Sequence, residues 1–269
     1  MRVRSEERPL LGALLPERVR WAEETGTVDG PEADHGSRPP WLFAEERALM
    51  ARATPGRRRE FARARLCAHR ALAALGVAAA PLLRGPRGAP AWPGGTLGSI
   101  THCAGYRGAA VAPAARFLGL GIDAEPHAPL PAGVREAVVF GPEEARLREL
   151  ADRRPDIAWD RLLFSAKESV YKAWSGYGGA WLGFEDAEVS WRLDGTDGPH
   201  PPARARAELP RAVGRFRARL LVPVPAGAGP FPGVLSGRWL VRGGLLLTAV
   251  AVPRPVPRPP HRTAPKEHR

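Results

Sequence analysis

Apolar residues recur at helical spacing in several segments of the chain. A period of three to four residues over 55–75 predicts an amphipathic helix, and a stronger pattern over 159–174 predicts a second one. Shorter helical patterns begin at Trp41 and cover 131–152. In the 159–174 helix, the face that we expect to be buried consists of Leu163, Ala166, Val170 and Trp174.

Strands are predicted on both sides of the 159–174 helix, by short apolar runs and by alternation of apolar and polar residues. Before the helix lie 98–102, 107–113 and 117–124, and after it lie 189–193, 215–220, 236–242 and 245–252. We expect the second and third of these runs to pair as a hairpin around Pro113, and the last two to pair around Gly243-Gly244.

Helices followed by strands occur twice along the chain, which predicts the α+β class. The predicted architecture is two similar α+β halves, residues 1–118 and 119–252, packed together. Residues 24–40 and 81–98 are polar or rich in glycine and proline, and are expected to be loops. Residues 253–269 form an Arg/Pro-rich tail that is predicted to be disordered.

The composition is that of a globular protein. The 269 residues are 44% hydrophobic and 25% charged, which excludes a collagen, a coiled coil and a wholly disordered chain. No run approaches the roughly 18 apolar residues of a membrane span, and the N-terminal apolar patch is too short for a secretory signal. Two cysteines cannot build a disulfide framework or a Cys-rich zinc site. We therefore expect a cytoplasmic protein.

The net charge of +12 points to anionic partners, such as nucleic acid, phosphorylated cofactors or acidic proteins. Among the 40 lysine and arginine residues only three are lysines, yet two of these, Lys167 and Lys172, lie within one short segment. A compact ammonium and a planar guanidinium are not equivalent. These two positions are therefore candidates for a role that needs lysine.

Asp123 and Glu125 follow an apolar strand pattern in the motif Gly121-Ile-Asp-Ala-Glu. Residues two apart in a strand point to the same face, so the two carboxylates are expected side by side. Such a pair repels unless a cation lies between them, and oxygen ligands favour Mg²⁺ or Mn²⁺ over zinc. The alternative is a solvated strand end.

Ser165, Glu168 and Lys172 share the helix face beside the buried one. Glu168 and Lys172 are four residues apart in the order that favours an ion pair, so the plain alternative is a surface salt bridge.

A small-residue loop, starting at Gly98, leads into a short strand that ends at His102. This histidine could hold a phosphate or be structural. Taken together, three carboxylates, a lysine, a histidine and loop arginines could hold a divalent ion that bridges a diphosphate, as phosphoryl transfer requires.

These motifs, in this order and spacing, resemble the 4'-phosphopantetheinyl transferase superfamily, and most closely its enterobactin synthetase component D branch. The resemblance rests on Gly121 to Glu125 and on Lys167-Glu168-Ser169 followed by Lys172. Further matching segments are the loop 89–93, the strand 98–102, the A-L-x-x-L-G end of the 55–75 helix and Trp181-Leu-Gly-Phe-Glu-Asp186.

The resemblance implies a pseudo-twofold pair of halves with coenzyme A in the cleft between them, and Mg²⁺ (or Mn²⁺) in the second half. It implies metal ligation by Asp123, Glu125 and Glu168, and catalytic roles for Asp123, Glu168 and Lys172. The residues expected to bind the coenzyme are Thr101, His102, Lys167 and Lys172, with Arg65, Arg84 and Arg87 added from their chemistry and position. For Lys167 a purely positional role is the alternative. The base for the serine proton is Glu168 or a water on the metal.

The implied activity is transfer of the 4'-phosphopantetheine arm of coenzyme A to a serine of an apo acyl or peptidyl carrier protein, with release of 3',5'-ADP. It would support siderophore, polyketide or nonribosomal peptide biosynthesis. The basic charge would steer acidic carrier domains, and we expect a monomer without nucleic-acid or membrane partners. Two alternatives stay open, a Mg²⁺-dependent nuclease and a basic nucleic-acid-binding protein, and the second would leave the acidic residues unexplained.

Overall fold

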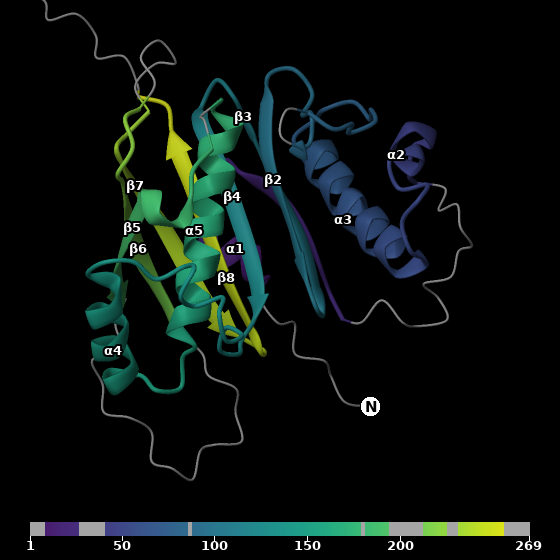
Figure 1. Cartoon of the computed structure of the whole chain (residues 1–269). Helices are drawn as coiled ribbons and strands as arrows, with labels where there is room; N and C mark the ends of the chain where they lie inside the picture. Colours follow the sequence, from purple (N-terminus) through teal and green to yellow (C-terminus); the bar gives the residue numbers. More distant parts are fainter. Residues whose placement is uncertain are drawn as a thin grey trace, which may run out of the picture.

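The computed structural model describes residues 9–26, 41–85, 88–178, 181–193, 212–224 and 231–255. In this part of the chain two antiparallel sheets, each packed against one long helix, form the α+β fold that the sequence predicts (Figure 1). No helix among these residues is long and apolar enough to cross a bilayer.

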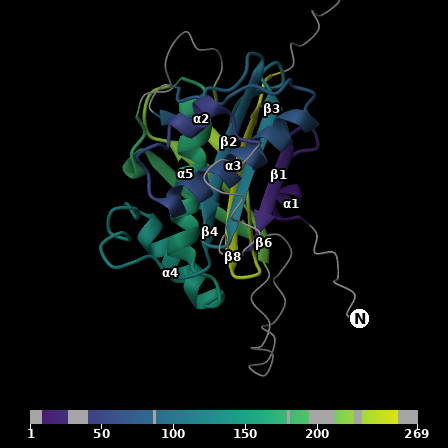
Figure 2. The same cartoon turned by 90° about the vertical axis from the view of Figure 1, so that its right-hand side faces the viewer.

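The first sheet is three-stranded and carries the helix α3 on one face (Figure 2). Its strands, in spatial order, are β1 (Arg20–Thr25), β3 (Tyr106–Pro113) and β2 (Thr96–Cys103). Helix α3 (Pro55–Ala74) begins at a proline. The residue before it, Thr54, caps the helix, because its side chain accepts a hydrogen bond from the N–H of Arg57. Cys67 and Ala68 on its inner face are fully buried in the core that α3 shares with β3. A short helix, α2 (Ala44–Ala48), lies on the side of α3 away from the sheet (Figure 1).

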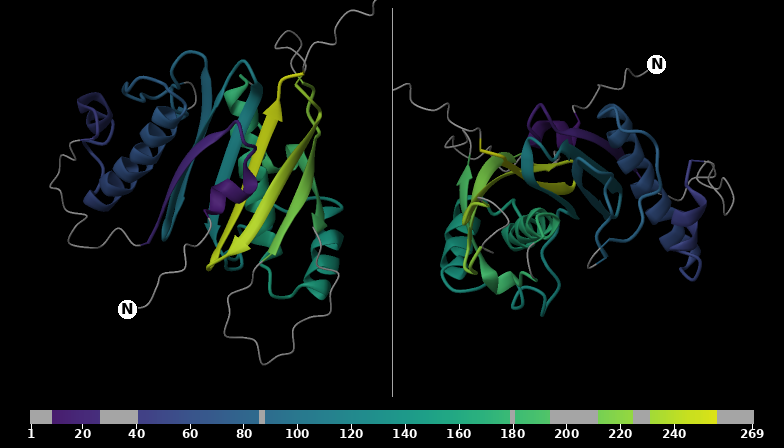
Figure 3. Two further views of the ribbon diagram at one scale, coloured as in Figure 1. Left: turned by 180° about the vertical axis from the view of Figure 1, so that it is seen from behind. Right: turned by 90° about the horizontal axis from the view of Figure 1, so that it is seen from above.

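The second sheet is five-stranded and packs against the helix α5. Its strands, in spatial order, are β4 (Phe117–Pro126), β8 (Leu245–Pro253), β7 (Val234–Arg242), β6 (Ala212–Leu220) and β5 (Ala187–Leu193). Helix α5 (Trp159–Gly176) lies on one face, and the short helix α1 (Leu10–Leu14) covers part of the other (Figure 3). Helix α4 (Glu143–Arg153) and the 3₁₀-helix η3 (Phe184–Asp186) flank α5.

Both long helices and the final hairpin confirm the sequence prediction. The predicted buried face of α5 is at most 1% exposed. Strands β7 and β8 pair antiparallel around Gly243 and Gly244, both of which have positive φ. In β6, buried and exposed residues alternate as expected.

The predicted hairpin of 107–113 with 117–124 is wrong. Strand β3 has β1 on one edge and β2 on the other, so it has no free edge for β4. Strand β4 pairs with β8 instead and belongs to the second sheet. The division of the chain at residue 118 stays a prediction, since α1, which precedes it, packs on the second sheet.

Two predicted helices are shorter than expected. The segment 131–142 forms turns instead of a helix, and Gly133 and Gly141 in it have positive φ. Helix α4 therefore begins only at Glu143. The pattern after Trp41 gives only the short α2. Most of the predicted loop over 24–40 and of the tail lies outside the described residues.

Strands β2 and β4 lie side by side where the two sheets meet, without a backbone ladder between them. The Ser99 hydroxyl accepts a hydrogen bond from the N–H of Ile122 at 3.0 Å. The Thr101 hydroxyl accepts one from the N–H of Ala124, also at 3.0 Å. Buried N–H groups on a strand edge need such partners. Two side chains of β2 therefore join the sheets.

Glycines in β4 let α5 lie directly against the strand. A Cβ at Gly121 would be 1.8 Å from the carbonyl oxygen of Ser169. At Gly119 it would be 2.6 Å from the carbonyl oxygen of Ala173. No side chain fits at these distances, so the two backbones are in contact. This approach brings side chains of α5 to the acidic end of β4.

We expect Gly121→Ala to destabilise the fold strongly. The added methyl group would collide with helix backbone, which cannot rotate away, so the loss should exceed the roughly 1–3 kcal/mol of ordinary overpacking. Gly94→Ala is the control, because a Cβ there meets nothing within 4 Å. Urea unfolding of both variants measures the effect, and wild-type stability of Gly121→Ala would contradict the contact between α5 and β4.

Candidate active site

Asp123 and Lys172 form an ion pair between β4 and α5. Lys172 Nζ donates to Asp123 Oδ1 at 2.7 Å and to the carbonyl oxygen of Ile122 at 3.2 Å. The Thr101 hydroxyl donates to the same Asp123 oxygen at 3.3 Å. Strands β2 and β4 and helix α5 therefore meet at one carboxylate, and both sheets contribute to it.

The second oxygen of Asp123 lacks a partner among the described residues. Asp123 is 5% exposed, and its Oδ2 atom is buried without a hydrogen-bond partner among the described residues. A buried carboxylate oxygen without a partner is unfavourable, and native structures rarely leave one. This oxygen is suited to a cation.

Glu125 and Glu168 lie within electrostatic reach of Asp123. Burial, reinforced by the charge of Asp123, raises the pKa of Glu125, although Arg161 donates to Glu125 Oε2 at 2.9 Å. Burial also raises the pKa of Glu168; the charge of Lys172 opposes this shift, and the two neighbouring carboxylates add to it. Glu168 has no hydrogen bond or ion pair with the residues that the structure describes.

The three carboxylates offer the oxygen ligands that Mg²⁺ prefers, but they are not closed around an ion. Within the described ranges, no three histidine, cysteine, aspartate or glutamate side chains are arranged to hold a metal. In place of a metal ion, Lys172 forms an ion pair with Asp123, and Arg161 forms one with Glu125. The donor chemistry thus fits a divalent ion, and joint ligation would require side chains to move.

The end of β2 meets the first turn of α3 at His102. Arg57 Nη1 lies 2.9 Å from His102 Nε2, and Arg57 also pairs with Glu60 at 3.2 Å. Burial lowers the pKa of His102, and the charge of Arg57 lowers it further. The sequence analysis did not identify Arg57, because it is the first of three consecutive arginines. Its contact with His102 depends on where α3 begins, which the sequence alone does not fix.

Arg65, predicted to bind coenzyme phosphates, is turned into the protein. It is 6% exposed, its Nε lies 3.8 Å from Glu46 Oε1, and its guanidinium lies over the Phe61 ring, 4.8 Å from the ring centre. Arg65 therefore links α3 to the buried carboxylate of α2. Arg84 is exposed and within electrostatic reach of Arg65, and Arg87 lies outside the described residues.

Two further predicted coenzyme contacts use their polar atoms inside the protein. Thr101 is buried and its hydroxyl bonds both Asp123 and Ala124. Lys167 is 3% exposed, and its ammonium donates to Glu143 and to two backbone carbonyls. Since an ammonium has three N–H donors, this arrangement argues against a direct phosphate contact by Lys167.

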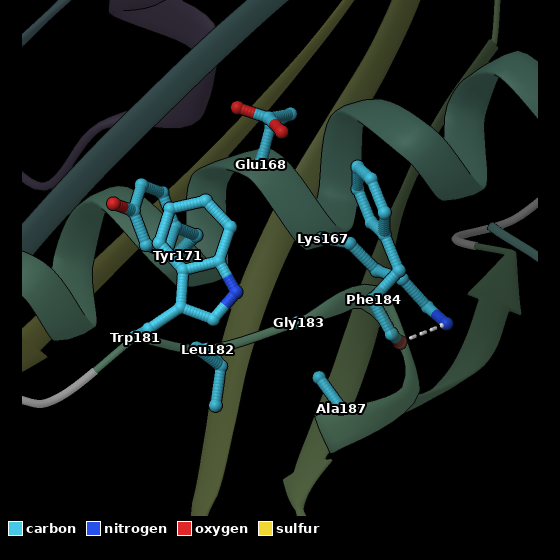
Figure 4. Close-up of a pocket in the computed structure, with 8 residues that line it drawn as sticks. All are labelled: Lys167, Glu168, Tyr171, Trp181, Leu182, Gly183, Phe184 and Ala187. Carbon is cyan, nitrogen blue, oxygen red and sulfur yellow. Dashed lines mark hydrogen bonds between the residues drawn. The ribbon is translucent and has the colours of Figure 1, made fainter. Parts of the chain in front are cut away.

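A pocket that the sequence analysis did not predict opens beside Glu168 (Figure 4). It has a volume of about 100 Å³ and a mostly apolar lining, made by Lys167, Glu168, Tyr171, Trp181, Leu182, Gly183, Phe184 and Ala187. The ring centres of Trp181 and Tyr171 are 5.4 Å apart, and Trp181 is 73% exposed. A largely apolar pocket beside a carboxylate is typical of a small-molecule site.

Comparison with known proteins decides the family. Residues 45–112 match the 4'-phosphopantetheinyl transferase N-terminal domain, and residues 119–206 match the 4'-phosphopantetheinyl transferase superfamily. The chain is 47% identical over 247 residues to 4'-phosphopantetheinyl transferase Svp from Streptomyces mobaraensis, covering 91% of this chain and 90% of that protein. The chain belongs to the 4'-phosphopantetheinyl transferases.

Two other relatives agree with this assignment. The transferase is 43% identical over 218 residues to PptT from Mycobacterium tuberculosis, covering 80% of this chain and 89% of that protein. It is 42% identical over 243 residues to Npt from Nocardia iowensis, covering 90% and 99%. The resemblance found in the sequence is thus confirmed, and the protein is an enzyme that attaches 4'-phosphopantetheine to carrier proteins. This family uses coenzyme A as its substrate, and the nuclease and nucleic-acid-binding alternatives are set aside.

We expect Glu168→Gln to raise the thermal stability of the transferase while it removes activity. The raised pKa means that the folded protein binds a proton at Glu168 more tightly than the unfolded chain does. Stability therefore falls as pH rises through that pKa, because the buried carboxylate must then ionise. A glutamine at this position has no such penalty.

Melting temperatures between about pH 5 and pH 8 test this expectation, and the advantage of Glu168→Gln should widen as pH rises. Glu149→Gln, at an exposed position of α4, is the matched control and should behave as wild type. A lower melting temperature for Glu168→Gln at the upper end of the range would mean that the ionised carboxylate is stabilised in the fold.

Proposed function

We propose that this transferase binds coenzyme A across the junction of β2 and β4, and that it moves the phosphopantetheine arm to a serine of an acidic apo carrier protein. The observation that carries this proposal is the meeting of Lys172 and Thr101 at the carboxylate of Asp123. Phosphoryl transfer depends on positioning and on neutralising phosphate charge. A site built from separate elements can surround a diphosphate from several directions.

Asp123, Glu125 and Glu168 would hold Mg²⁺, or Mn²⁺, beside the diphosphate. The buried Oδ2 of Asp123 without a partner supports this role, as do the raised pKa values of the two glutamates. A nearby cation would stabilise the ionised form of all three groups. When bound, the ion would neutralise phosphate charge and orient the diphosphate.

The 3'-phosphoadenosine end would lie against the first turn of α3. Arg57 and His102 approach each other there, and the N–H groups at the start of a helix favour anions. A neutral His102 accepts from Arg57 through one ring nitrogen and can donate to a phosphate oxygen through the other. Arg84 would add positive charge from the same half of the protein, and Arg87 stays a candidate on sequence grounds. Arg65 pairs with the buried Glu46 instead.

The pantetheine arm would occupy the pocket beside Glu168. This arm is a flexible chain of alkyl segments and amides, and the apolar walls that include Tyr171 and Leu182 suit it. An arm in this pocket would leave its phosphate next to the carboxylates.

The reaction would begin with attack of the carrier serine oxygen on the phosphorus that bears the arm. A new O–P bond forms, the P–O bond to 3',5'-ADP breaks, and the departing phosphate oxygen keeps the electron pair. Glu168 is our candidate for the base that takes the serine proton, because its carboxylate makes no hydrogen bond or ion pair with the described residues. Lys172 would stabilise the negative charge on the departing phosphate.

The carrier domain would belong to a siderophore, polyketide or nonribosomal peptide synthetase. The net charge of +12 supports an acidic partner, since opposite charge raises the encounter rate. We further propose that the transferase works as a cytoplasmic monomer without nucleic-acid or membrane partners, because one chain supplies both sides of the site.

Mixing the transferase with apo carrier protein, coenzyme A and Mg²⁺ should add one phosphopantetheine arm to the carrier, as mass spectrometry would detect. Asp123→Asn should slow the transfer by at least about a hundredfold, because it removes charge from the carboxylate at the centre of the site. Arg148→Ala, at a side chain on α4 that is 72% exposed, should leave the rate unchanged. An unaffected rate in Asp123→Asn, or in excess EDTA, would contradict the proposed metal site.

A further inference from the structure

Lys167 and Glu143 form an ion pair inside the protein, on the side of α5 that faces η3. Both side chains are 2% exposed, and Lys167 Nζ lies 2.7 Å from Glu143 Oε2. The same ammonium donates to the carbonyl oxygens of Val138 at 2.8 Å and Phe184 at 2.7 Å. Figure 4 shows the bond to Phe184 at the edge of the pocket.

Glu143 extends this network to β5 and to the turn before α4. Its Oε1 accepts a hydrogen bond from the N–H of Val189 at 2.8 Å, and its Oε2 accepts one from the N–H of Phe140 at 3.1 Å. Two side chains therefore connect four segments of the chain: α5, the stretch 138–143, η3 and β5. Because all their polar contacts are made within the protein, neither group is available to solvent.

The network joins the two walls of the pocket. Helix α5 supplies one wall, with Glu168 and Tyr171, and the stretch 181–187 supplies the other. Phe184 lies within this second wall, and its carbonyl oxygen accepts the hydrogen bond from Lys167 of α5. Val189 lies just after the wall, and its N–H donates to Glu143. Replacing a buried ion pair by apolar residues of similar volume often leaves the stability of a protein unchanged or raises it. The specific effect of this pair is therefore to fix the position of the segments that it joins.

We propose that Lys167 and Glu143 are positioning residues that set the separation of the pocket walls for the pantetheine arm, and that neither contacts the coenzyme phosphates. This inference rests on the proposed binding of the arm in the pocket. Helix α5 has separate anchors, since Ser165 and Ser169 bond Thr248 of β8 at 2.9 and 2.6 Å. Loss of the pair should therefore loosen the 181–187 wall and leave the phosphate site in place.

The test compares coenzyme A with adenosine 3'-phosphate 5'-diphosphate, which keeps the 3'-phosphate and the diphosphate and lacks only the pantetheine. Calorimetry gives the Kd of both ligands, in the presence of Mg²⁺, for wild type and for the double variant K167M/E143Q. The glutamine keeps an acceptor for Val189, and its NH₂ group can donate to a carbonyl that Lys167 served. We expect the variant to bind coenzyme A at least about tenfold more weakly than wild type, and to change the Kd of adenosine 3'-phosphate 5'-diphosphate less than about twofold.

The matched control is R135M/E144Q. Arg135 and Glu144 form an exposed ion pair at 2.7 Å on the same turn and helix, so their loss should change neither Kd. If K167M/E143Q does not fold, E143D is measured in the same way, because it keeps both charges and shortens the reach by one methylene.

The outcomes separate this inference from the proposed function. Equal affinity of wild type for coenzyme A and adenosine 3'-phosphate 5'-diphosphate would show that the pocket does not hold the arm. A wild-type preference for coenzyme A that persists in the folded variant would overturn the positioning role alone. A loss of affinity for adenosine 3'-phosphate 5'-diphosphate as large as that for coenzyme A would also overturn it, and would return Lys167 to the phosphates.

Discussion

The edge of β4 that faces β2 determines how the two sheets of this transferase meet. Its N–H groups at Ile122 and Ala124 are satisfied by the hydroxyls of Ser99 and Thr101, and no backbone ladder runs between the strands. The connection runs from side chains of β2 to the backbone of β4, and each sheet packs against its own long helix. The junction therefore carries groups from both sheets, and Asp123 receives contacts from β2 and from α5 at once.

The charges around this junction are of two kinds. Lys167 and Glu143 are buried, and their polar atoms all make contacts within the protein. Asp123 keeps an oxygen without a partner, and Glu125 and Glu168 have raised pKa values. Unfavourable charge of one sign, concentrated in one place, is typical of a site whose partner arrives with the substrate. The electrostatic cost to stability is thus concentrated at these three carboxylates.

The sequence predicted what depends on local pattern. The long helices, the hairpin at Gly243 and the motif around Asp123 follow from periodicity and residue type, and the structure contains them. The sequence could not show that β1 and β2 occupy both edges of β3, so the predicted pairing of β3 with β4 was wrong. It could not distinguish Arg57 from the arginines beside it, or see that Lys167 faces inward, because both depend on how distant segments pack.

The most direct test of this account is a crystal structure of the transferase with coenzyme A and Mn²⁺, in which anomalous scattering locates the metal. The account predicts Mn²⁺ at the free oxygen of Asp123, the diphosphate beside Lys172, and the phosphoadenosine end against Arg57 and His102. A metal bound away from Asp123, or a nucleotide seated on one sheet alone, would contradict the claim that the β2–β4 junction forms the active site.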